Sequence, residues 1–280
     1  MNDTETATYA VFGNPIKHSK SPAIHAAFAE QLGESLTYRA VRVELDDFEQ
    51  QVSAFFSRGG GGLNITVPFK ERAFALADES SDRAIRAGAA NCLIPTETGG
   101  IKADNTDGVG LIRDMVANQG WQLAGRRVLV LGAGGAVRGV LAPLLAEAPA
   151  SIVIANRTPE KAAALAQLFQ GSRTAVSGTG LQEIAGSAFD LVINGTSASL
   201  EGEMPALPEL ALSDRCCCYD MMYGAEPTPF MRWSAGNMAW AVTDGLGMLV
   251  EQAAESYYLW RGRRPATTPV IQQIRHMIIA

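Results

Sequence analysis

A strand, a glycine-rich turn and a helix follow one another in the middle of the chain, and this succession constrains the fold more than any other feature. The strand is Val128–Leu131, the most apolar one that the sequence predicts, and the turn after it is Gly132-Ala133-Gly134-Gly135-Ala136. A buried parallel strand that runs through glycines into a helix predicts a dinucleotide-binding fold, because glycines let backbone N–H groups approach a pyrophosphate at the positive helix end. Val137 stands where the G-x-G-x-x-G pattern has its third glycine, and a tight turn without a ligand is the alternative.

The rest of the chain repeats this alternation of short apolar strands and helical stretches, which predicts an α/β fold with parallel sheets. Strands are expected over residues 8–12, 37–43, 63–67, 91–94, 101–103 and 151–155, and helices over residues 22–32 and 48–58 and directly after residue 67. We expect two α/β domains with a cleft between them. The substrate-binding domain is discontinuous, with residues 1–107 and 246–280, and the nucleotide-binding domain, of the Rossmann type, comprises residues 108–245. Gly120–Gly125 predicts a hinge or boundary.

Composition and charge exclude several classes of protein. The net charge of −6 argues against a nucleic-acid partner, because surfaces that bind nucleic acid are basic. No apolar run approaches the roughly 20 residues that cross a bilayer, and the acidic start of the chain lacks the features of a signal peptide, so we expect a cytoplasmic protein without membrane contact. Cys92 and the consecutive Cys216–Cys218 have neither disulfide nor metal-ligand spacing, and we interpret them as reduced core residues.

The strand after the glycine turn ends in a cationic segment, Asn156-Arg157-Thr158, and Lys161 follows one turn into the next helix. Proteins that bind NAD carry an acid at this place, roughly 20 residues past the glycines, for the ribose 2′-hydroxyl. Arginine in place of the acid suits a 2′-phosphate, so we expect NADP rather than NAD. The alternative is an exposed arginine beside a lysine on a solvated helix face.

A second polar segment, Asn64-Ile65-Thr66-Val67-Pro68-Phe69-Lys70, ends in a lysine that local electrostatics disfavours. Pro68 suits the first position of a helix, which puts Lys70 in the first turn, where the positive end of the helix opposes a cation. On the strand before it, Asn64 and Thr66 share one face. Together these residues predict a site for a polar substrate. The alternative is a surface lysine and a solvated strand face.

Two further clusters combine polar side chains with helix starts. Ser19 and Ser21 have strand-like spacing that suits an anionic group, although Ser21 before Pro22 also suits a helix N-cap. Asp107, in Asp104-Asn105-Thr106-Asp107-Gly108, opens a helix and is equally suited to cap it. Chemistry offers Asp107 a second role, because reduction of a ketone by hydride leaves an alkoxide that needs a proton. A lysine at a helix N-terminus, steered by a carboxylate, is able to supply that proton and to take it back in the reverse reaction.

Taken in order, these motifs resemble the shikimate dehydrogenase family, and the resemblance runs nearly from end to end of the chain. The segments that carry it are Gly13–Pro22, Asn64–Lys70, Gly88–Asn91, Asn105–Gly108, the glycine turn, Asn156–Thr158, Asn194–Ser197, Tyr219–Tyr223 and Gly245–Gln252. Each segment is moderately specific, and their common order is highly specific. Val137 is compatible with the family, which tolerates a residue other than glycine at that position.

The resemblance implies NADP-dependent, reversible reduction of 3-dehydroshikimate to shikimate, in the biosynthesis of chorismate and the aromatic amino acids. It implies that Lys70 and Asp107 are the catalytic pair and that Ser19 and Ser21 hold the substrate carboxylate. Further substrate contacts would come from Asn64, Thr66, Asn91, Tyr223 and Gln252. Cofactor contacts would come from Gly132, Ala133, Gly134, Gly135, Ala136, Asn156, Arg157, Thr158, Lys161, Thr196, Gly245 and Met248.

Some positions depart from the family's pattern. Cys92 replaces the threonine usual after Asn91, and Ser199 stands where a glycine is common, which removes backbone freedom from the loop on the nicotinamide side. Neither residue belongs to the expected proton transfer. The alternatives are a paralogue that oxidises quinate or uses NAD, and a non-catalytic sensor of a nucleotide or a polyol acid. Arg157 argues against NAD, the Lys70 and Asp107 pair argues against a sensor, and the chain is expected to be a monomer or a homodimer.

Overall fold

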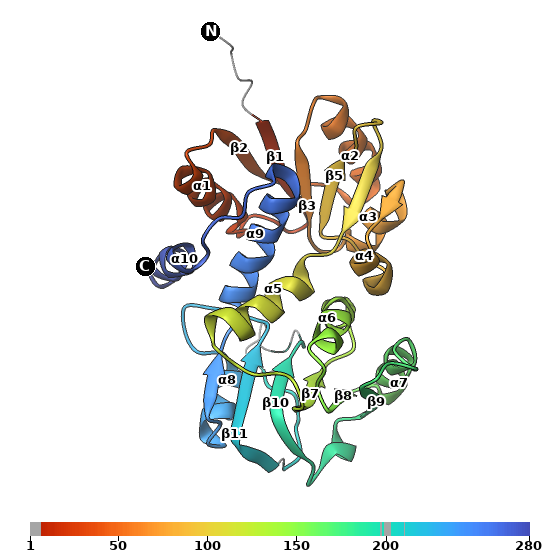
Figure 1. Cartoon of the computed structure of the whole chain (residues 1–280), viewed down its shortest axis with the longest axis vertical. Helices are drawn as coiled ribbons and strands as arrows, with labels where there is room; N and C mark the ends of the chain where they lie inside the picture. The colour runs from red at the N-terminus through yellow and green to blue at the C-terminus, as the bar shows by residue number, and fades with distance from the viewer. Residues whose placement is uncertain (1–6, 197, 199–202, 210) are drawn as a thin grey trace. The chain divides into compact units, whose positions relative to one another are not determined.

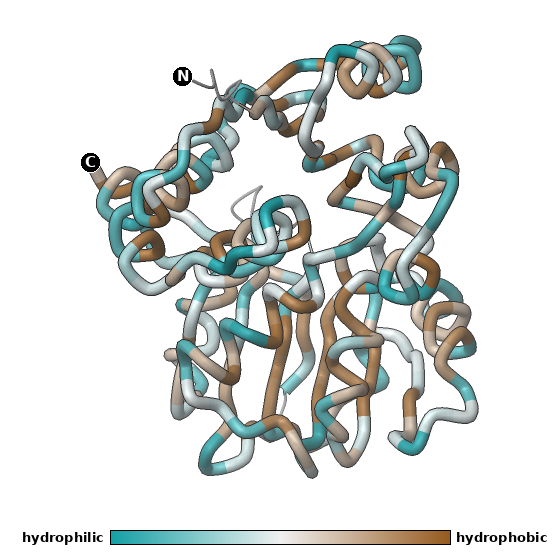
Figure 2. The backbone as a smooth tube through the Cα atoms, turned by 45° about the horizontal axis from the view of Figure 1, so that its top comes forward, coloured by the Kyte–Doolittle hydropathy of each residue, from teal (hydrophilic) through white to brown (hydrophobic). Residues whose placement is uncertain are grey.

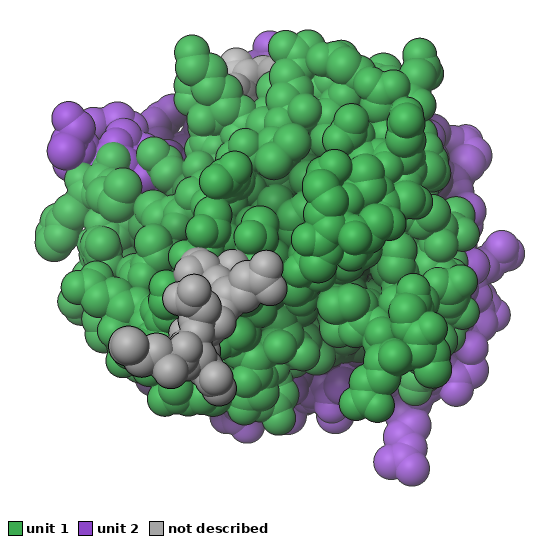
Figure 3. Space-filling view, turned by 90° about the horizontal axis from the view of Figure 1, so that it is seen from above, with its two compact units in different colours: residues 1–110, 250–277 green, residues 111–249, 278–280 purple. Residues whose placement is uncertain are grey.

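The computed structural model describes residues 7–196, 198, 203–209 and 211–280, and these form two compact units (Figure 3). Unit 1 comprises residues 1–110 and 250–277, and unit 2 comprises residues 111–249 and 278–280. Within the described residues each unit has its own six-stranded sheet with helices, which confirms the predicted α/β fold. Ser197 and Ser199, two positions named from the sequence, lie outside the described residues.

Unit 1 contains a mixed sheet and helices from both ends of the chain (Figure 1). Its strands, in spatial order, are β2 (Leu36–Arg42), β1 (Ala7–Gly13), β3 (Gly62–Ile65), β5 (Cys92–Pro95), β6 (Ile101–Asp104) and β4 (Glu79–Ser80). β1 pairs in parallel with β2 and β3, whereas β5 is antiparallel to β3 and β6, so the prediction of parallel sheets is wrong for this unit. Its helices are α1 (Ser21–Leu32), α2 (Phe48–Ser57), α3 (Lys70–Leu76), α4 (Asp82–Ala87), the start of α5 (Asp107–Arg113), and most of α9 (Leu246–Arg261) and α10 (Thr268–Ile279).

Aromatic packing in unit 1 holds the start of α3 in place. Phe69, the residue before α3, is fully buried and stacks on Phe48 of α2 with ring centroids 4.5 Å apart. Burying a side chain of this size contributes about 2 kcal/mol to the free energy of unfolding. The backbone of Lys70 therefore begins its helix directly beside a fixed core residue.

Unit 2 contains a fully parallel sheet in the order that defines a Rossmann fold. Its strands in chain order are β7 (Arg127–Leu131), β8 (Ser151–Asn156), β9 (Ala175–Gly180), β10 (Ala188–Asn194), β11 (Ala211–Asp220) and β12 (Ala241–Thr243). They lie in the spatial order β12-β11-β10-β7-β8-β9, which reverses direction between β7 and β10, and nucleotides bind at such a switch point. Helices α6 (Gly135–Ala146), α7 (Pro159–Gln167) and α8 (Pro229–Gly236) follow β7, β8 and β11.

The sheet of unit 2 is buried on both faces, as its apolar strands predict, and Figure 2 shows these strands as the brown, hydrophobic part of the chain. Cys217 belongs to the apolar cluster on one face, whereas Cys216 and Cys218 belong to the cluster on the other. All four cysteines are free and buried, in agreement with their interpretation as core residues. No helix in the described part of the chain is long and apolar enough to cross a membrane.

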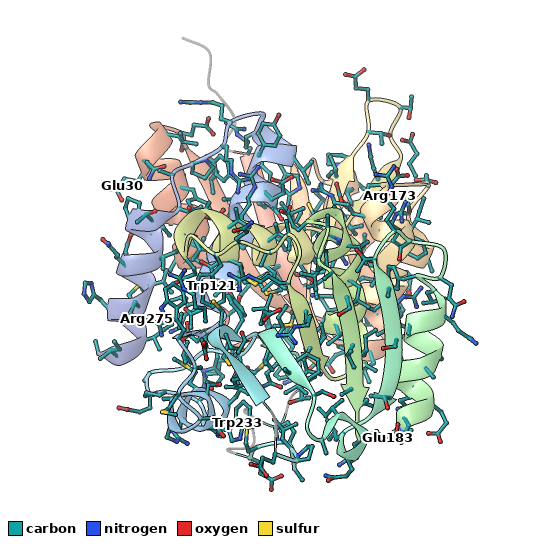
Figure 4. The ribbon with its side chains drawn as sticks, turned by 60° about the horizontal axis from the view of Figure 1, so that its bottom comes forward. Glu30, Trp121, Arg173, Glu183, Trp233 and Arg275 are labelled. Atoms are coloured by element: carbon teal, nitrogen blue, oxygen red, sulfur yellow. The ribbon has the colours of Figure 1, made fainter. Side chains whose placement is uncertain are left out.

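Most expected elements form with ends shifted by one or two residues, and a few expectations are wrong. The segment Gly120–Gly125 is part of unit 2 and marks no boundary, because Trp121 and Leu123 are buried in the core of that unit. Trp121, labelled in Figure 4, packs edge-on to Tyr219 with ring centroids 6.1 Å apart. The strand expected over residues 63–67 ends at Ile65, because Phe69 N–H bonds back to the carbonyl of Thr66 in a turn. Pro68 consequently precedes the helix by two residues instead of opening it.

Candidate active site

Lys70 and Asp107 meet in unit 1 as an ion pair. Each is the first residue of a helix, Lys70 of α3 and Asp107 of α5, so the predicted place of Lys70 in a first helical turn is confirmed. Lys70 Nζ donates to Asp107 Oδ2 over 2.6 Å, and the two side chains are 28% and 14% exposed. A pair that is partly shielded from water, yet open to it, is suited to exchanging a proton with a bound molecule.

The carboxylate of Asp107 is occupied by side chains and does not cap its helix. Its Oδ1 accepts from Asn91 Nδ2 over 2.8 Å, while Oδ2 accepts from Lys70. The backbone N–H of Asp107 donates to Asn105 Oδ1 over 3.1 Å, so the asparagine two residues earlier satisfies the helix start. The capping role considered from the sequence is therefore wrong for Asp107, and its charge is directed at Lys70.

Asn91 connects Asp107 to a larger buried network. Besides Asp107, its Nδ2 lies within hydrogen-bond distance of Thr106 Oγ1 (2.9 Å) and Gln252 Oε1 (3.2 Å). Its Oδ1 accepts from the backbone N–H of Thr106 over 2.8 Å. Asn91 and Thr106 are buried, whereas Gln252 of α9 is half-buried. Two segments far apart in the sequence, residues 106–107 and α9, thus converge on the amide group of Asn91.

Asn64, at the end of the polar strand β3, is buried and belongs to the same network. Its Nδ2 donates to the Asn91 backbone oxygen (3.0 Å) and to Ser256 Oγ (2.9 Å). Its Oδ1 accepts from the hydroxyl of Tyr38, on β2, over 2.7 Å. Thr66 follows β3, where it is half-buried, and its backbone N–H donates to the carbonyl of Phe12.

The two serines predicted to hold an anion lie at the start of α1. Ser21 is the first residue of the helix, and Lys20 takes the N-cap position without a side-chain cap. The capping role considered for Ser21 is therefore wrong. Ser19 Oγ accepts from the backbone N–H of Ser21 over 3.3 Å. Both side chains are largely withdrawn from solvent, Ser21 more so than Ser19.

A charged cluster that the sequence did not single out holds the chain just before Asp107. Asp104, the last residue of β6, is buried and accepts from Arg83 Nε and Nη2 over 2.9 and 2.7 Å. Ser81 Oγ and the backbone N–H of Asn105 donate to the same carboxylate. Arg83 also pairs with Glu255 of α9 over 3.0 Å. Because Arg83 binds both oxygens of this carboxylate, it fixes the orientation of the Asp104 side chain.

In unit 2 the glycine turn joins β7 to α6 and leaves its backbone open. Gly132 has φ +101°, a conformation that favours glycine. Gly134 and Gly135 are exposed, and a Cβ built on either one would meet no atom within 4 Å. Val137, at the position of the third glycine in the usual pattern, is buried, and a Cβ on Gly195 would lie 2.4 Å from it. Gly195 therefore supplies the close packing that a third glycine would otherwise provide.

The cationic segment lies at the carboxyl end of β8, next to the glycine turn in the sheet. Arg157, Thr158 and Lys161 are exposed, and Asn156 Nδ2 donates to the carbonyl of Thr158 over 3.0 Å. The exposure of these side chains also agrees with the alternative of solvated cations. An exposed arginine at the end of this strand is able to pair with a 2′-phosphate.

The remaining residues expected to contact the cofactor or substrate also lie in unit 2. Thr196 is tied to Asn194 Oδ1 through its hydroxyl (2.7 Å), and Met248 N–H donates to the hydroxyl of Tyr219 (3.3 Å). Gly245 packs so tightly that a Cβ would lie 2.2 Å from the carbonyl oxygen of Met221. Tyr223 is half-buried, and its burial, followed by the charge of Asp244, raises the pKa of its hydroxyl.

The fold and the site together define a class of protein: a dehydrogenase that uses a pyridine nucleotide. One unit is a Rossmann fold with an open glycine turn, and the other holds a lysine–aspartate pair among buried amides. The comparisons with known proteins are more specific. The family described as "Shikimate dehydrogenase substrate binding domain" matches residues 11–93, "Shikimate / quinate 5-dehydrogenase" matches residues 114–201, and "Shikimate 5'-dehydrogenase C-terminal domain" matches residues 245–275. The chain belongs to the shikimate dehydrogenase family.

Individual relatives match the chain over nearly its whole length. The shikimate dehydrogenase (NADP(+)) of Cellvibrio japonicus is 56% identical over 273 residues, which cover 98% of each chain. The shikimate 5-dehydrogenase of Thermus thermophilus, solved with NADP(H) and shikimate, is 31% identical, with a TM-score of 0.84 and 97% and 99% of the two chains covered. An enzyme of Pseudomonas putida called Ael1 is 49% identical, with a TM-score of 0.88 and 96% and 98% covered.

Proposed function

We propose that this protein catalyses the reversible, NADP-dependent reduction of 3-dehydroshikimate to shikimate, a step toward chorismate and the aromatic amino acids. The observation that carries the proposal is the contact of Lys70 with Asp107, in the unit whose sequence matches the substrate-binding domain of the family. Unit 1 would correspond to the substrate-binding domain, for which the sequence predicts residues 1–107 and 246–280. Unit 2 would correspond to the NADP-binding domain, for which the sequence predicts residues 108–245. The identity of 56% to a shikimate dehydrogenase (NADP(+)) supports substrate and cofactor alike.

The residues of unit 2 fit the proposed cofactor. The open backbone at Gly134 and Gly135 leaves room for a pyrophosphate at the N-terminus of α6, and exposed Arg157 with Lys161 suits a 2′-phosphate. The other cofactor contacts would come from Gly132, Ala133, Ala136, Asn156, Thr158, Thr196, Gly245 and Met248. NADPH held by these residues would supply the hydride for the ketone carbon.

Lys70 would give its proton to the oxygen of the ketone as the C–O double bond becomes a hydroxyl. In the reverse direction the neutral amine of Lys70 would take the hydroxyl proton. Asp107 keeps Nζ in a single position, because its Oδ1 is itself held by Asn91. General acid–base catalysis of this kind contributes about 10²–10⁴-fold to a rate.

The substrate would be held by the polar groups around this pair. Ser19 and Ser21 would bind the carboxylate, and Asn64, Thr66, Asn91 and Gln252 would bind the hydroxyl and carbonyl groups. Tyr223 would lie near substrate and nicotinamide. The connected network of Asn64, Asn91 and Thr106 supports this assignment, since buried amides that are already oriented lose little freedom when a ligand binds.

A second candidate is the oxidation of quinate, which the family description matching residues 114–201 also names. One set of assays separates the candidates: absorbance at the nicotinamide band follows NADP⁺ or NAD⁺ reduction with shikimate or with quinate as substrate. We expect turnover with shikimate and NADP⁺. Faster turnover with quinate would favour the second candidate, and no turnover with any combination would favour a non-catalytic sensor.

The free, buried cysteines support a reducing compartment, and we place the reaction in the cytoplasm, with the enzyme acting as a monomer or a homodimer. Light scattering on the purified protein measures the oligomeric state directly. A species larger than a homodimer would contradict this expectation.

A further inference from the structure

His25, in α1, is a fully buried histidine whose two ring nitrogens have no hydrogen-bond partner in the described part of the chain. Buried polar atoms almost always have partners, so such a residue calls for a physical explanation. Burial lowers the pKa of His25 to about 3, and the nearby Asn64 side chain offsets this effect only in part. The ring is therefore neutral at any pH at which the protein would work.

The contacts of His25 are made by the face and edges of its ring. It stacks on Tyr38 of β2 with ring centroids 4.1 Å apart and an angle of 8° between the planes. Phe28 and Tyr257 lie 5.8 and 6.0 Å away, and Trp260 lies at 5.5 Å. An imidazole enclosed by aromatic rings in this way acts through shape and stacking, and the closest of these contacts is with Tyr38.

Tyr38 in turn decides how the amide of Asn64 is oriented. Asn64 Oδ1 has no proton, so Tyr38 must be the donor in their 2.7 Å hydrogen bond. Both protons of Asn64 Nδ2 are used as well, one toward the Asn91 carbonyl and one toward Ser256. Turning the amide over would place Asn64 Oδ1 against the carbonyl oxygen of Asn91, where two acceptors repel. Asn64 consequently has only acceptor capacity left on its side chain.

We propose that His25 is a positioning residue of the substrate site: its ring holds Tyr38 so that the tyrosine hydroxyl keeps Asn64 Oδ1 available as an acceptor for a substrate hydroxyl. The inference rests on the proposed function, in which Asn64 contacts the substrate. It adds a direction to that contact, because a substrate hydroxyl would donate to Asn64 and not accept from it. It also gives a purpose to an imidazole whose ring nitrogens are buried without a hydrogen bond of normal length and angle.

Three single variants test the proposal. Tyr38→Phe removes one hydroxyl, His25→Leu removes the ring at similar volume, and His25→Phe keeps a ring without nitrogens. For Tyr38→Phe and His25→Leu we expect the KM for shikimate to rise about 3- to 10-fold, the effect of one hydrogen bond, with the KM for NADP⁺ unchanged. His25→Phe should restore most of the affinity for shikimate, because the stacking surface is retained.

The double variant His25→Leu/Tyr38→Phe gives the decisive comparison. If His25 acts through the tyrosine hydroxyl, the double variant has about the same KM for shikimate as Tyr38→Phe alone. If the increases in KM of the two single variants multiply in the double variant, the proposal is wrong. It is also wrong if His25→Phe is as impaired as His25→Leu. Circular dichroism and the KM for NADP⁺ show whether each variant is folded. If His25→Leu does not fold, Tyr38→Phe decides alone, and a value equal to wild type would refute the inference.

Turnover of the wild-type protein is measured first in the same assay. An inactive wild type would refute the proposed function, whereas an active wild type with unaffected variants would refute only the role of His25 and Tyr38.

Discussion

The two units offer different kinds of polar group at their candidate sites. Unit 1 buries a connected set of side chains, in which Asn64, Asn91 and Thr106 each depend on the next. Unit 2 also buries polar side chains, such as Asn194 and Asp220, but at its glycine turn it offers backbone groups, with Gly134 and Gly135 facing open space. The difference agrees with the two roles proposed for the units. Unit 1 would deliver a proton to one atom of the substrate, whereas unit 2 would bind a pyrophosphate through backbone N–H groups and a helix end.

This contrast has a consequence for substitutions. In unit 1 the loss of one side chain leaves a buried partner unsatisfied, so effects should spread through the network and appear in substrate kinetics. In unit 2 substitutions near the turn should act locally and appear in nucleotide binding.

Lys70→Ala should lower kcat by about 10²–10⁴, because the group that moves the proton is lost, while the KM for NADP⁺ stays near wild type. Steady-state kinetics in both directions measure the two effects. Lys102→Ala, which removes a half-buried lysine on β6 of the same unit, is the matched control and should remain active. Near-normal turnover of Lys70→Ala would rule out its role in proton transfer.

Stability in acid should depend on His25. The unfolded chain protonates this histidine near its usual pKa of 6.5, whereas the folded protein does so only near 3. Between these values the unfolded state binds more protons, so the free energy of unfolding falls as pH decreases, by at most about 1.4 kcal/mol per pH unit for this residue.

Urea unfolding of the wild type and of His25→Phe at several pH values between 7 and 4 measures this dependence. The phenylalanine variant should lose stability less steeply, since it has no group to protonate, and all other titrating residues are common to both proteins. Identical slopes for the two proteins would show that His25 is not held neutral by burial.

Arg157→Ala should raise the KM for NADP⁺ about 10- to 100-fold, because one charge-assisted hydrogen bond to a phosphate is lost, and should leave the KM for shikimate unchanged. The substitution should change the KM for NAD⁺ only slightly, since NAD⁺ lacks the 2′-phosphate. Arg173→Ala, at another exposed arginine of unit 2, serves as the control. An equal loss with NAD⁺ and NADP⁺ would contradict the role of Arg157 as selector.

Two alanine substitutions in the glycine turn should separate binding from folding. Gly134→Ala meets no neighbour and should change the free energy of unfolding by less than about 0.5 kcal/mol while weakening NADP⁺ binding. Gly132→Ala should cost about 1 kcal/mol or more, because φ is +101° and the new Cβ would lie 3.2 Å from the Gly195 oxygen. Urea unfolding measures the stability of each variant, and nucleotide titration measures its binding of NADP⁺. Equal losses of stability in Gly134→Ala and Gly132→Ala would contradict the geometry of the turn.

Helix capping shows where local sequence reasoning fails in this protein. Ser21 and Asp107 both occur in contexts that favour an N-cap, yet neither side chain caps its helix. Local propensity describes which roles a residue is suited for. The choice among those roles depends on partners from elsewhere in the chain, such as Lys70 for Asp107, 37 residues away.

The residues that sequence reasoning did not single out share the same property. His25, Tyr38, Arg83 and Ser256 have no motif around them that marks a site. Their significance lies in contacts of long range, such as the hydrogen bond between Asn64 and Ser256, which are 192 positions apart. An arginine or serine on a helix is ordinary until its buried partner is known.

The sequence by itself determined the α/β alternation, the glycine turn at the end of β7, the cationic segment after β8 and the place of Lys70 in a first helical turn. These features depend on neighbouring residues, through hydrophobic period, backbone freedom and the field of a helix end. Only the tertiary structure decided that Asp107 points at Lys70, that Gly195 makes room for Val137, and that a neutral histidine supports Tyr38. Each of these depends on which groups remain unsatisfied once distant segments pack together and exclude water.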